Sequence, residues 1–234
     1  MRKENRVSIT VFAGFILFCV ITLFYGQSLS QFLSGIRVWN WISVAEVAIG
    51  LPFLLLLQNS GFPELLDKKI SARDRYVLPA MAGIFFGILD VLVIKVIQHP
   101  QPYETLPPFL QPFPFSIFLY TAGALSIEVW YRLIPLTLIM WLVGNKLLKG
   151  KYNNLVFIIA AILTSLREPL EQMPSGSNLF IVYALTSGFL MNLVQAYYFR
   201  NSGFLASLFV RLGHYLIWHI LLGIYVEYVE LAAK

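Results

Sequence analysis

Residues 125–136 read LSIEVWYRLIPL and set a carboxylate and a guanidinium, those of Glu128 and Arg132, inside an apolar run that extends from Phe115 to Val143. A charged side chain at the centre of a bilayer costs at least about 2.5 to 3.5 kcal/mol on insertion scales, so such residues normally face the protein interior and are paired. Residues four positions apart lie on one face of a helix, and Glu128 and Arg132 can therefore pair with each other. The other interpretation is that they belong to a functional site with partners from several helices.

The chain around this stretch has the composition of a membrane protein. Of its 234 residues, 58% are hydrophobic and 12% are charged, whereas soluble proteins have about 25% charged residues. Several apolar runs reach the roughly 20 residues needed to cross a hydrocarbon core of about 30 Å. We expect seven transmembrane helices, at residues 7–25, 38–58, 77–97, 115–143, 154–172, 179–199 and 204–226.

The spacing of these runs predicts a single domain. The polar loops between them are too short to hold a soluble domain, so the predicted fold is an all-α polytopic membrane helical bundle over residues 1–234, with three spans in residues 1–114 and four in residues 115–234. The first run follows the basic tail MRKENR, but it is long and lacks a clear small-residue cleavage site. We therefore expect an uncleaved helix rather than a signal peptide.

The basic residues predict the orientation of the chain, because Lys and Arg are in excess on the cytoplasmic side of membrane proteins. Alternating spans place most of them on one side: Arg2, Lys3, Arg6, Lys68, Lys69, Arg73, Arg75, Lys146, Lys149, Lys151 and Arg200. The other side receives only Arg37 and Lys234. We expect a multi-pass protein of the cell membrane with a cytoplasmic N-terminus and an external C-terminus. We expect the basic residues behind the net charge of +5 to interact with anionic lipids, so the lipid bilayer is the expected partner. No nucleic-acid partner is expected.

Polar residues recur at membrane depth in the last four predicted spans. Besides the pair quoted above, these spans carry Arg167, Glu168, Arg211, His214 and His219. If these side chains face inward at similar depth they form a polar cavity, which in lipid is a functional-site hypothesis by default. A carboxylate beside an imidazole can activate water in general-base chemistry. The single cysteine, Cys19, excludes an internal disulfide and disfavours a thiolate metal site.

The stretch IEVWYRLIPL resembles the first motif of the CAAX-protease and bacteriocin-processing (CPBP, or Abi) family of intramembrane peptidases, whose pattern is Glu-Glu-x-x-x-Arg in the middle of a span. Glu128 and Arg132 fall on the second Glu and the Arg, and Ile127 stands at the first Glu. The family's second motif is Phe-x-x-x-His. It can be laid on SLREPLEQMPSG, with Glu168 in place of Phe and Gln172 in place of His.

The end of the chain resembles the family's last region more closely. Residues 186–220, TSGFLMNLVQAYYFRNSGFLASLFVRLGHYLIWHI, follow the outline of a glycine-bearing helix, a short Arg-x-x-Gly turn and a final helix carrying His-x-x-x-Asn. His214 is the candidate for that His, and Trp218 stands at the Asn position with His219 just after it. The order and spacing of four consecutive helices, from Phe115 onward, support the resemblance more than any one motif does.

The resemblance implies a helical membrane fold in which a Glu and a His orient a water molecule, with or without a divalent metal, to cleave a peptide or lipidated peptide near the membrane surface. Two departures bear on this expectation. Ile127 cannot act as a base, and Gln172 can hydrogen-bond but cannot shuttle protons. Peptide hydrolysis by this chain therefore requires substitutes for both groups.

Such substitutes are present in the sequence. A carboxylate would take the proton from water, a histidine would polarise the carbonyl or protonate the leaving amine, and arginines would steady the carboxylates and the oxyanion. These roles fall in turn on Glu128 or Glu168, on His214 or His219, and on Arg132 and Arg211. The two histidines are five residues apart, which turns them about 140° from each other on an α-helix. We therefore do not expect them to hold one metal ion together.

Two other functions stay open. A noncatalytic member of the same fold would bind a membrane partner or a lipid, and a small transporter would use an intramembrane charge path. The residues of that path would be Glu46, Asp90, Lys95, Glu128 and His214. The peptidase and binding hypotheses require one cavity among the last four helices, whereas the transporter hypothesis requires Asp90 and Lys95 to join it. A binding role becomes the better account if Arg132 and Arg211 cap every carboxylate.

Small residues inside the expected spans predict where helices approach closely. Gly83, Gly87 and Gly188 lie within such spans. Glycine allows two backbones to come into contact, and this kind of packing drives helix association in membranes.

Overall fold

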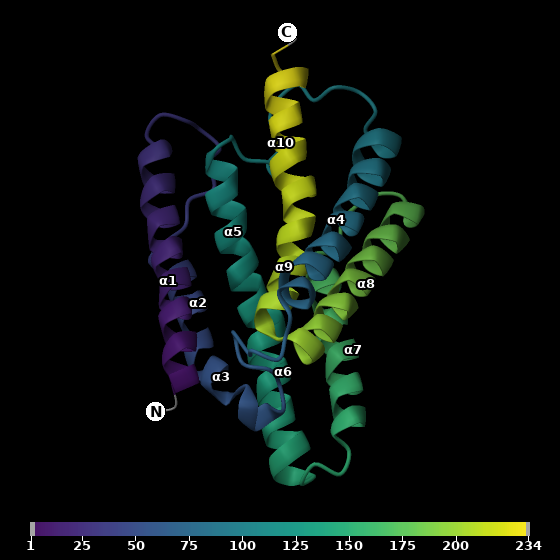
Figure 1. The fold of residues 1–234 in the computed structure, drawn as a ribbon. Helices are drawn as coiled ribbons and strands as arrows, with labels where there is room; N and C mark the ends of the chain where they lie inside the picture. Colours follow the sequence, from purple (N-terminus) through teal and green to yellow (C-terminus); the bar gives the residue numbers. More distant parts are fainter. Residues whose placement is uncertain (1–2, 233–234) are drawn as a thin grey trace.

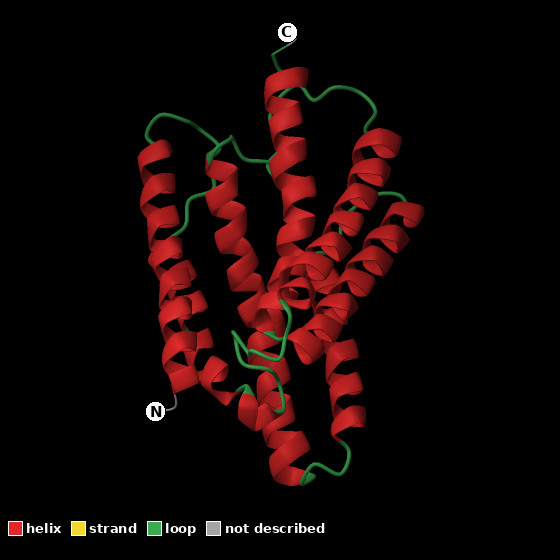
Figure 2. Cartoon of the chain, viewed as in Figure 1, coloured by secondary structure: helices red, strands yellow, loops and turns green. Residues whose placement is uncertain are grey.

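The computed structural model describes residues 3–232, with side chains described from Arg6 onward. Arg2, Lys234 and the side chain of Lys3, which contributed to the expected orientation, lie outside the described part. Within it, every regular element is helical (Figure 1, Figure 2), which confirms the all-α fold class.

The helices form one elongated bundle whose axes run roughly along its length (Figure 1). The α-helices are α1 (Lys3–Leu29), α2 (Trp41–Ala48), α3 (Gly50–Leu56), α4 (Leu78–Asp90), α5 (Phe115–Glu128), α6 (Ile134–Ile139), α7 (Asn153–Glu171), α8 (Asn178–Ser202), α9 (Phe204–Tyr215) and α10 (Leu222–Tyr225). A short 3-10 helix is η1 (Gln58–Ser60). Turns with wider, π-helical hydrogen bonding are η2 (Arg73–Val77), η3 (Val91–Gln98), η4 (Val129–Leu133), η5 (Met140–Leu147), η6 (Leu216–Leu221) and η7 (Val226–Glu230).

Five helical stretches are long and apolar enough to cross a membrane. They are Arg6–Leu29, Arg73–Gln98, Phe115–Leu147, Asn178–Ser202 and Phe204–Glu230. The other two expected spans differ: Trp41–Leu56 is a shorter apolar helix, and α7 is not among the five. Each of these two segments adjoins a stretch without regular structure. Residues 36–40 precede α2, and residues 173–177 follow α7.

The starts of α2 and α8 are fixed by side-chain caps. The side-chain oxygen of Asn40 accepts a hydrogen bond from the backbone N–H of Ser43 at 3.0 Å, and the hydroxyl of Ser177 accepts one from the N–H of Phe180 at 3.3 Å. Such caps satisfy backbone donors that the first turn of a helix leaves free. Each non-helical stretch therefore ends, and the next helix begins, at a defined residue.

Glycines let α4 and α9 pack with their backbones in contact, as the sequence predicts for Gly83. A Cβ atom at Gly83 would lie 1.8 Å from the carbonyl oxygen of Val210, and one at Gly213 would lie 2.2 Å from that of Ala80. One turn further along α4, a Cβ atom at Gly87 would lie 2.9 Å from the carbonyl oxygen of His214. This packing sets the end of α4 directly beside the end of α9.

The end of α7 is level with the middle of α8. A Cβ atom at Gly188 would lie 3.1 Å from Cγ of Pro169, so the expected close approach at Gly188 is also confirmed. Because Pro169 lies in the last turn of α7, residues 178–187 of α8 extend beyond the end of α7. Space is thereby left beside the first part of α8.

The largest apolar core draws side chains from α1, α2, α3, α5, α7, α8 and α9. Phe12 of α1 packs against Phe204 at the start of α9 with ring centroids 6.3 Å apart, and Tyr25 meets Phe115 edge to face at 5.4 Å. These contacts join the first helix to helices from the second half of the chain. The N- and C-terminal ends lie at opposite ends of the bundle (Figure 1).

Candidate functional site

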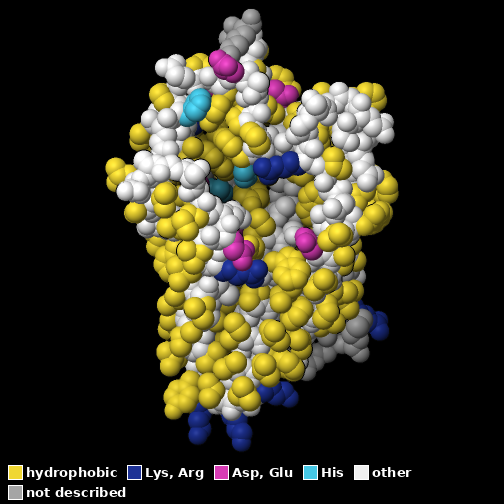
Figure 3. Space-filling model, turned by 180° about the vertical axis from the view of Figure 1, so that it is seen from behind, with side chains coloured by type: hydrophobic (Ala, Val, Ile, Leu, Met, Phe, Trp, Pro, Cys, Tyr) yellow, Lys and Arg dark blue, Asp and Glu magenta, His cyan; other side chains and the backbone are white. Residues whose placement is uncertain are grey.

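A cavity of about 840 Å³ lies where α4, α5, α8 and α9 meet above the end of α7. Residues 37–39 and Ser43 close one side of it. Figure 3 shows a hollow in the side of the bundle, bordered by hydrophobic side chains and containing histidine. Most of the polar residues that the sequence singled out in the last four spans lie in or beneath this space, and Arg167 does not.

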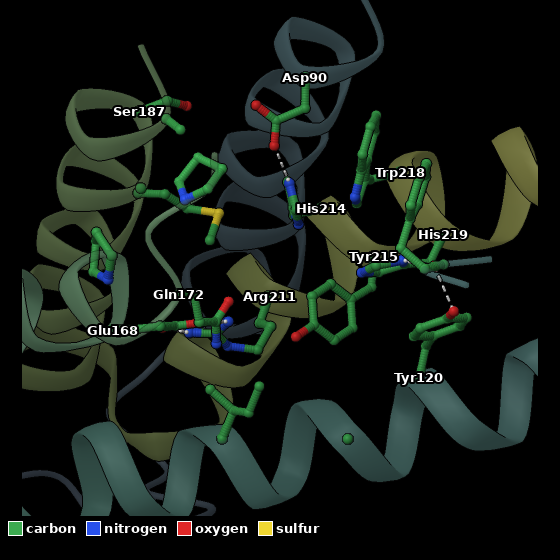
Figure 4. Close-up of a pocket in the computed structure, with 18 of the residues that line it drawn as sticks. Asp90, Tyr120, Glu168, Gln172, Ser187, Arg211, His214, Tyr215, Trp218 and His219 are labelled. Atoms are coloured by element: carbon green, nitrogen blue, oxygen red, sulfur yellow. Dashed lines mark hydrogen bonds and ion pairs between the residues drawn. The ribbon is translucent and has the colours of Figure 1, made fainter. Parts of the chain in front are cut away.

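Arg211 forms the floor of the cavity together with Glu168. Its Nη1 and Nη2 donate to the two carboxylate oxygens of Glu168 at 2.8 and 2.6 Å, and its Nε donates to Oε1 of Glu128 at 2.8 Å. Arg211 is only 1% exposed. One guanidinium therefore bridges two carboxylates that come from α5 and α7, and Figure 4 shows Arg211 and Glu168 side by side.

Glu128 lies beneath this floor rather than in the cavity. It is 0% exposed and does not line the cavity. Besides Arg211, its Oε1 accepts a hydrogen bond from Nε2 of Gln195 at 2.8 Å, and its Oε2 accepts one from the hydroxyl of Ser207. Both oxygens have donors, so this carboxylate is not placed to take a proton from water in the cavity.

Arg132 does not pair with Glu128, so of the two interpretations of this stretch the structure does not show the local ion pair. Its guanidinium instead donates to the side-chain and backbone oxygens of Asn192 and, at 3.2 Å, to Oε1 of Gln195. It also donates to the carbonyl oxygen of Tyr131 at 2.7 Å. Two physical causes are visible. The turn after Glu128 is π-helical, which widens the spacing on which four-apart pairing depends, and α8 presents two side-chain amides.

A second polar group lies higher in the cavity, between α4 and α9. Nε2 of His214 lies 2.8 Å from Oδ2 of Asp90, and the hydroxyl of Tyr183 donates to Oδ1 of Asp90 at 2.6 Å. His214 is 7% exposed, and its Nδ1 is buried without a hydrogen-bond partner among residues 3–232. Figure 4 shows this pair and the Arg211–Glu168 pair on different sides of one space.

His219 belongs to an aromatic wall of the same cavity. Its Nδ1 donates to the carbonyl oxygen of Phe109 at 2.8 Å, the hydroxyl of Tyr120 donates to the same oxygen at 2.6 Å, and the two rings stack at 4.0 Å. The rings of His214 and His219 are 6.5 Å apart between centroids and both line the cavity. The π-helical turn of η6 separates them, so the angle expected for an ideal α-helix does not apply.

The donors around the cavity do not fit a bound divalent metal. In the part of the chain that the structure describes, no group of three His, Cys, Asp or Glu residues is arranged to hold a metal ion. Both oxygens of Glu168 are taken by Arg211, and Nδ1 of His219 is taken by a backbone carbonyl.

The other residues that the sequence suggested for the site lie in the cavity, on the surface or in a separate ion pair. Gln172 and Ile127 line the cavity, and Gln172 lies beside the Arg211–Glu168 pair (Figure 4). Arg167 faces outward instead of inward and pairs with Glu171 at 2.8 Å on the surface. Lys95 pairs with Glu230 at 2.9 Å, away from this cavity.

The charge path suggested for a transporter is only partly assembled. Asp90 joins the cavity through His214, but Lys95 does not, and Glu46 is not among the residues that line the cavity. Lys95 also donates to the carbonyl oxygens of His99 and Gln101, at 3.2 and 2.7 Å, which holds its ammonium group against the loop that follows η3.

Some residues of the site were not predicted from the sequence. Arg37, Trp39, Tyr120 and Tyr183 line the cavity, and Ser207 supports Glu128. One signal was available for Ser207, which precedes Arg211 by one helical turn and so shares its face. Another was available for Arg37, the isolated basic residue on the side of the chain poor in Lys and Arg.

Comparison with known proteins found no matching family model, no matching curated protein and no matching solved structure.

Proposed function

We propose that this protein is a noncatalytic membrane protein of CPBP-like architecture that binds a lipid-like amphiphile in its intramembrane cavity. The observation that carries the proposal is the engagement of Arg211 by both Glu128 and Glu168. In a buried network of this kind the charges and donors satisfy one another. A carboxylate held in this way is a poor acceptor for a proton from water.

The position that the peptidase resemblance assigns to a base supports the same proposal. Ile127 lines the cavity, whereas Glu128, the neighbouring residue of the motif, is buried under the floor. The motif residue that faces the cavity is thus apolar. Water activation by the first motif would need a carboxylate where isoleucine stands.

The shape and lining of the cavity favour an amphiphile. Ligand cavities of about 300 to 1,000 Å³ enclose most of a small ligand and are typically apolar with a few placed polar groups. Here Trp39, Tyr120, Tyr215 and Trp218 contribute aromatic surface. The hollow lies in the side of the bundle rather than at either end (Figure 3), which is where acyl chains surround a membrane protein.

We place the N-terminus in the cytoplasm and the C-terminus outside, with seven segments crossing the cell membrane. The two ends of the chain lie at opposite ends of the bundle (Figure 1), which is consistent with an odd number of crossings. Lys and Arg gather at the end of the molecule away from the C-terminus (Figure 3). In this assignment α2–α3 and α7 cross together with the non-helical stretches beside them, and the cavity lies in the outer half of the membrane.

Filling the cavity tests the proposal. Gly123 lines the cavity, and a Cβ atom there meets nothing within 4 Å, so Gly123→Phe adds a ring to the cavity without a backbone clash. We expect native mass spectrometry of protein purified from lipid nanodiscs to show about tenfold less bound lipid in this variant than in the wild type. Gly14→Phe is the matched control, because Gly14 is exposed on α1 and also has no neighbour within 4 Å.

Two results would contradict the proposal. Equal lipid retention by the wild type and Gly123→Phe would show that the bound lipid is outside the cavity. Cleavage of a membrane-anchored peptide library by the wild type, lost in Gly123→Phe but not in Gly14→Phe, would show that the cavity is a peptidase site.

Hydrolysis by the His214–Asp90 pair is the second candidate function. A carboxylate on Nε2 fixes the imidazole tautomer and leaves Nδ1 free to act as a base. If this pair activates water, His214→Gln abolishes cleavage in the peptide assay, whereas the control Gly14→Phe keeps it. An absence of cleavage by the wild type would remove this candidate.

A further inference from the structure

The non-helical stretch before α2 is held against the cavity by Gln111. Oε1 of Gln111 accepts a hydrogen bond from the backbone N–H of Arg37 at 2.9 Å, and its Nε2 donates to the carbonyl oxygen of Gly35 at 3.3 Å. Gln111 is itself buried. Irregular backbone at membrane depth is tolerated where protein holds it or where it lines a cavity. The two hydrogen bonds from Gln111 therefore keep the backbone of Arg37 in a fixed place at the cavity.

The guanidinium of Arg37 lines the cavity without a partner. Within residues 3–232 its side chain makes no hydrogen bond and no ion pair, in contrast to Arg211, which has two carboxylate partners. Arg37 is exposed, so its guanidinium can be reached by a ligand. A guanidinium offers a planar set of donors that matches a carboxylate or a phosphate. The group that Arg37 is best placed to bind is therefore an anion.

The charges elsewhere in the site do not supply that anion. The two carboxylates of the floor are bound to Arg211, and Asp90 is bound to Tyr183 and His214. Tyr120 and His219 line the same cavity as Arg37, but neither is an acidic partner. An external anion would complete the arrangement.

A second group also lacks a partner. Nδ1 of His214 is buried and unpaired, although His214 lines the same cavity as Arg37. An unpaired buried nitrogen is costly, so a ligand that supplies a hydrogen bond there gains affinity. Two polar groups without a partner, in a cavity that aromatic side chains also line, fit a molecule with a polar head and an apolar body.

We infer that the cavity takes a lipid with an anionic headgroup, phosphate or carboxylate, and that Arg37 binds this headgroup. The inference rests on the lipid-binding function proposed above and adds the class of lipid. The side-facing hollow in Figure 3 favours a lipid as the source of the anion over a free anion from water.

Lipid selectivity tests this assignment. The protein is reconstituted in nanodiscs that hold phosphatidylcholine with equal amounts of phosphatidylglycerol or oleate, and native mass spectrometry reports which lipid stays bound. We expect the wild type to retain the anionic lipid in preference to phosphatidylcholine, and Arg37→Gln to reduce that preference by about tenfold, as expected for the loss of one charge-assisted hydrogen bond. Arg37→Lys should keep part of the preference, because it keeps the charge but not the planar fork.

Arg73→Gln is the matched control, because it removes one positive charge from an exposed residue of η2 outside the cavity. It should retain the wild-type preference. Inorganic phosphate should not displace the bound lipid; displacement would mean that a free anion, not a lipid headgroup, is recognised. An unchanged preference in Arg37→Gln would overturn the role of Arg37.

The outcomes also separate this inference from the proposed function. If the wild type binds anionic and zwitterionic lipids equally, and Gly123→Phe loses both, the cavity binds lipid but Arg37 does not select the headgroup. If the wild type retains no lipid at all, the proposed function itself fails.

Discussion

Two positions one turn apart on α9 use their polar side chains in different ways. At Arg211 every donor group faces an oxygen, and the carboxylates of Glu128 and Glu168 are closed off with it. At His214 one ring nitrogen is held by Asp90 and the other has no partner among the described residues. The floor of the cavity is thus a closed network that stabilises the fold, and the wall above it keeps polar groups available to a ligand. Charge inside the membrane serves both purposes within one helix.

The largest test of this comparison is removal of the cation of the floor. Arg211→Met keeps an unbranched side chain but leaves Glu128 and Glu168 buried without their shared partner. We expect the free energy of unfolding to fall by about 3 to 5 kcal/mol, as for other buried ion pairs that lose one member. The measurement is reversible unfolding in mixed detergent micelles. Stability like that of the wild type would mean that the floor is not a closed network.

A smaller effect is expected when one carboxylate of the floor is neutralised. Glu128→Gln keeps the shape of the side chain, and Arg211 retains Glu168, so we expect a loss of about 1.5 to 3 kcal/mol in the same unfolding assay. Glu171→Gln is the matched control, because Glu171 pairs with Arg167 on the surface and such pairs contribute about 0 to 1 kcal/mol. Equal losses in the two variants would contradict the special role of the floor.

The smallest effect on stability is expected at the wall. Arg37→Gln removes a guanidinium that has no partner within residues 3–232, so the free energy of unfolding should change by no more than about 0.5 kcal/mol in lipid-free detergent. The same variant should alter lipid selectivity. If it instead unfolds as easily as Arg211→Met, the distinction between floor and wall is wrong.

The sequence predicted the helical class and the positions of the apolar segments because both depend on composition along the chain. The hypothesis of inward-facing polar residues, which rests on the need of charged groups in lipid to avoid the acyl chains, holds for Glu168, Arg211 and His214 but not for Arg167. Their partners could not be predicted in the same way. They depend on which helices become neighbours, and here that is set by backbone contacts such as the one at Gly83.

The local pairing of Glu128 with Arg132 shows the limit most clearly. The spacing of four residues assumes a regular α-helix, but the turn between Glu128 and Arg132 is π-helical. In addition, the side-chain oxygens of Asn192 and Gln195 on α8 accept hydrogen bonds from Arg132. Arg37 shows a different limit. Arg37 lies on the side of the chain that has few Lys and Arg residues, which marks it as unusual in the sequence. Only the fold shows that it lines a cavity.

The partners of Glu128 and Arg132 also have a consequence for biosynthesis. Gln195, Ser207 and Arg211 follow Glu128 by 67, 79 and 83 residues, and Asn192 follows Arg132 by 60. Ribosomes make a chain from its N-terminus, so α5 and η4 are complete well before α8 and α9 exist. During that interval Glu128 and Arg132 lack these partners from α8 and α9, and an unpaired charge in lipid is costly. We therefore expect stable insertion of this segment to depend on the last two long helices, which are made much later.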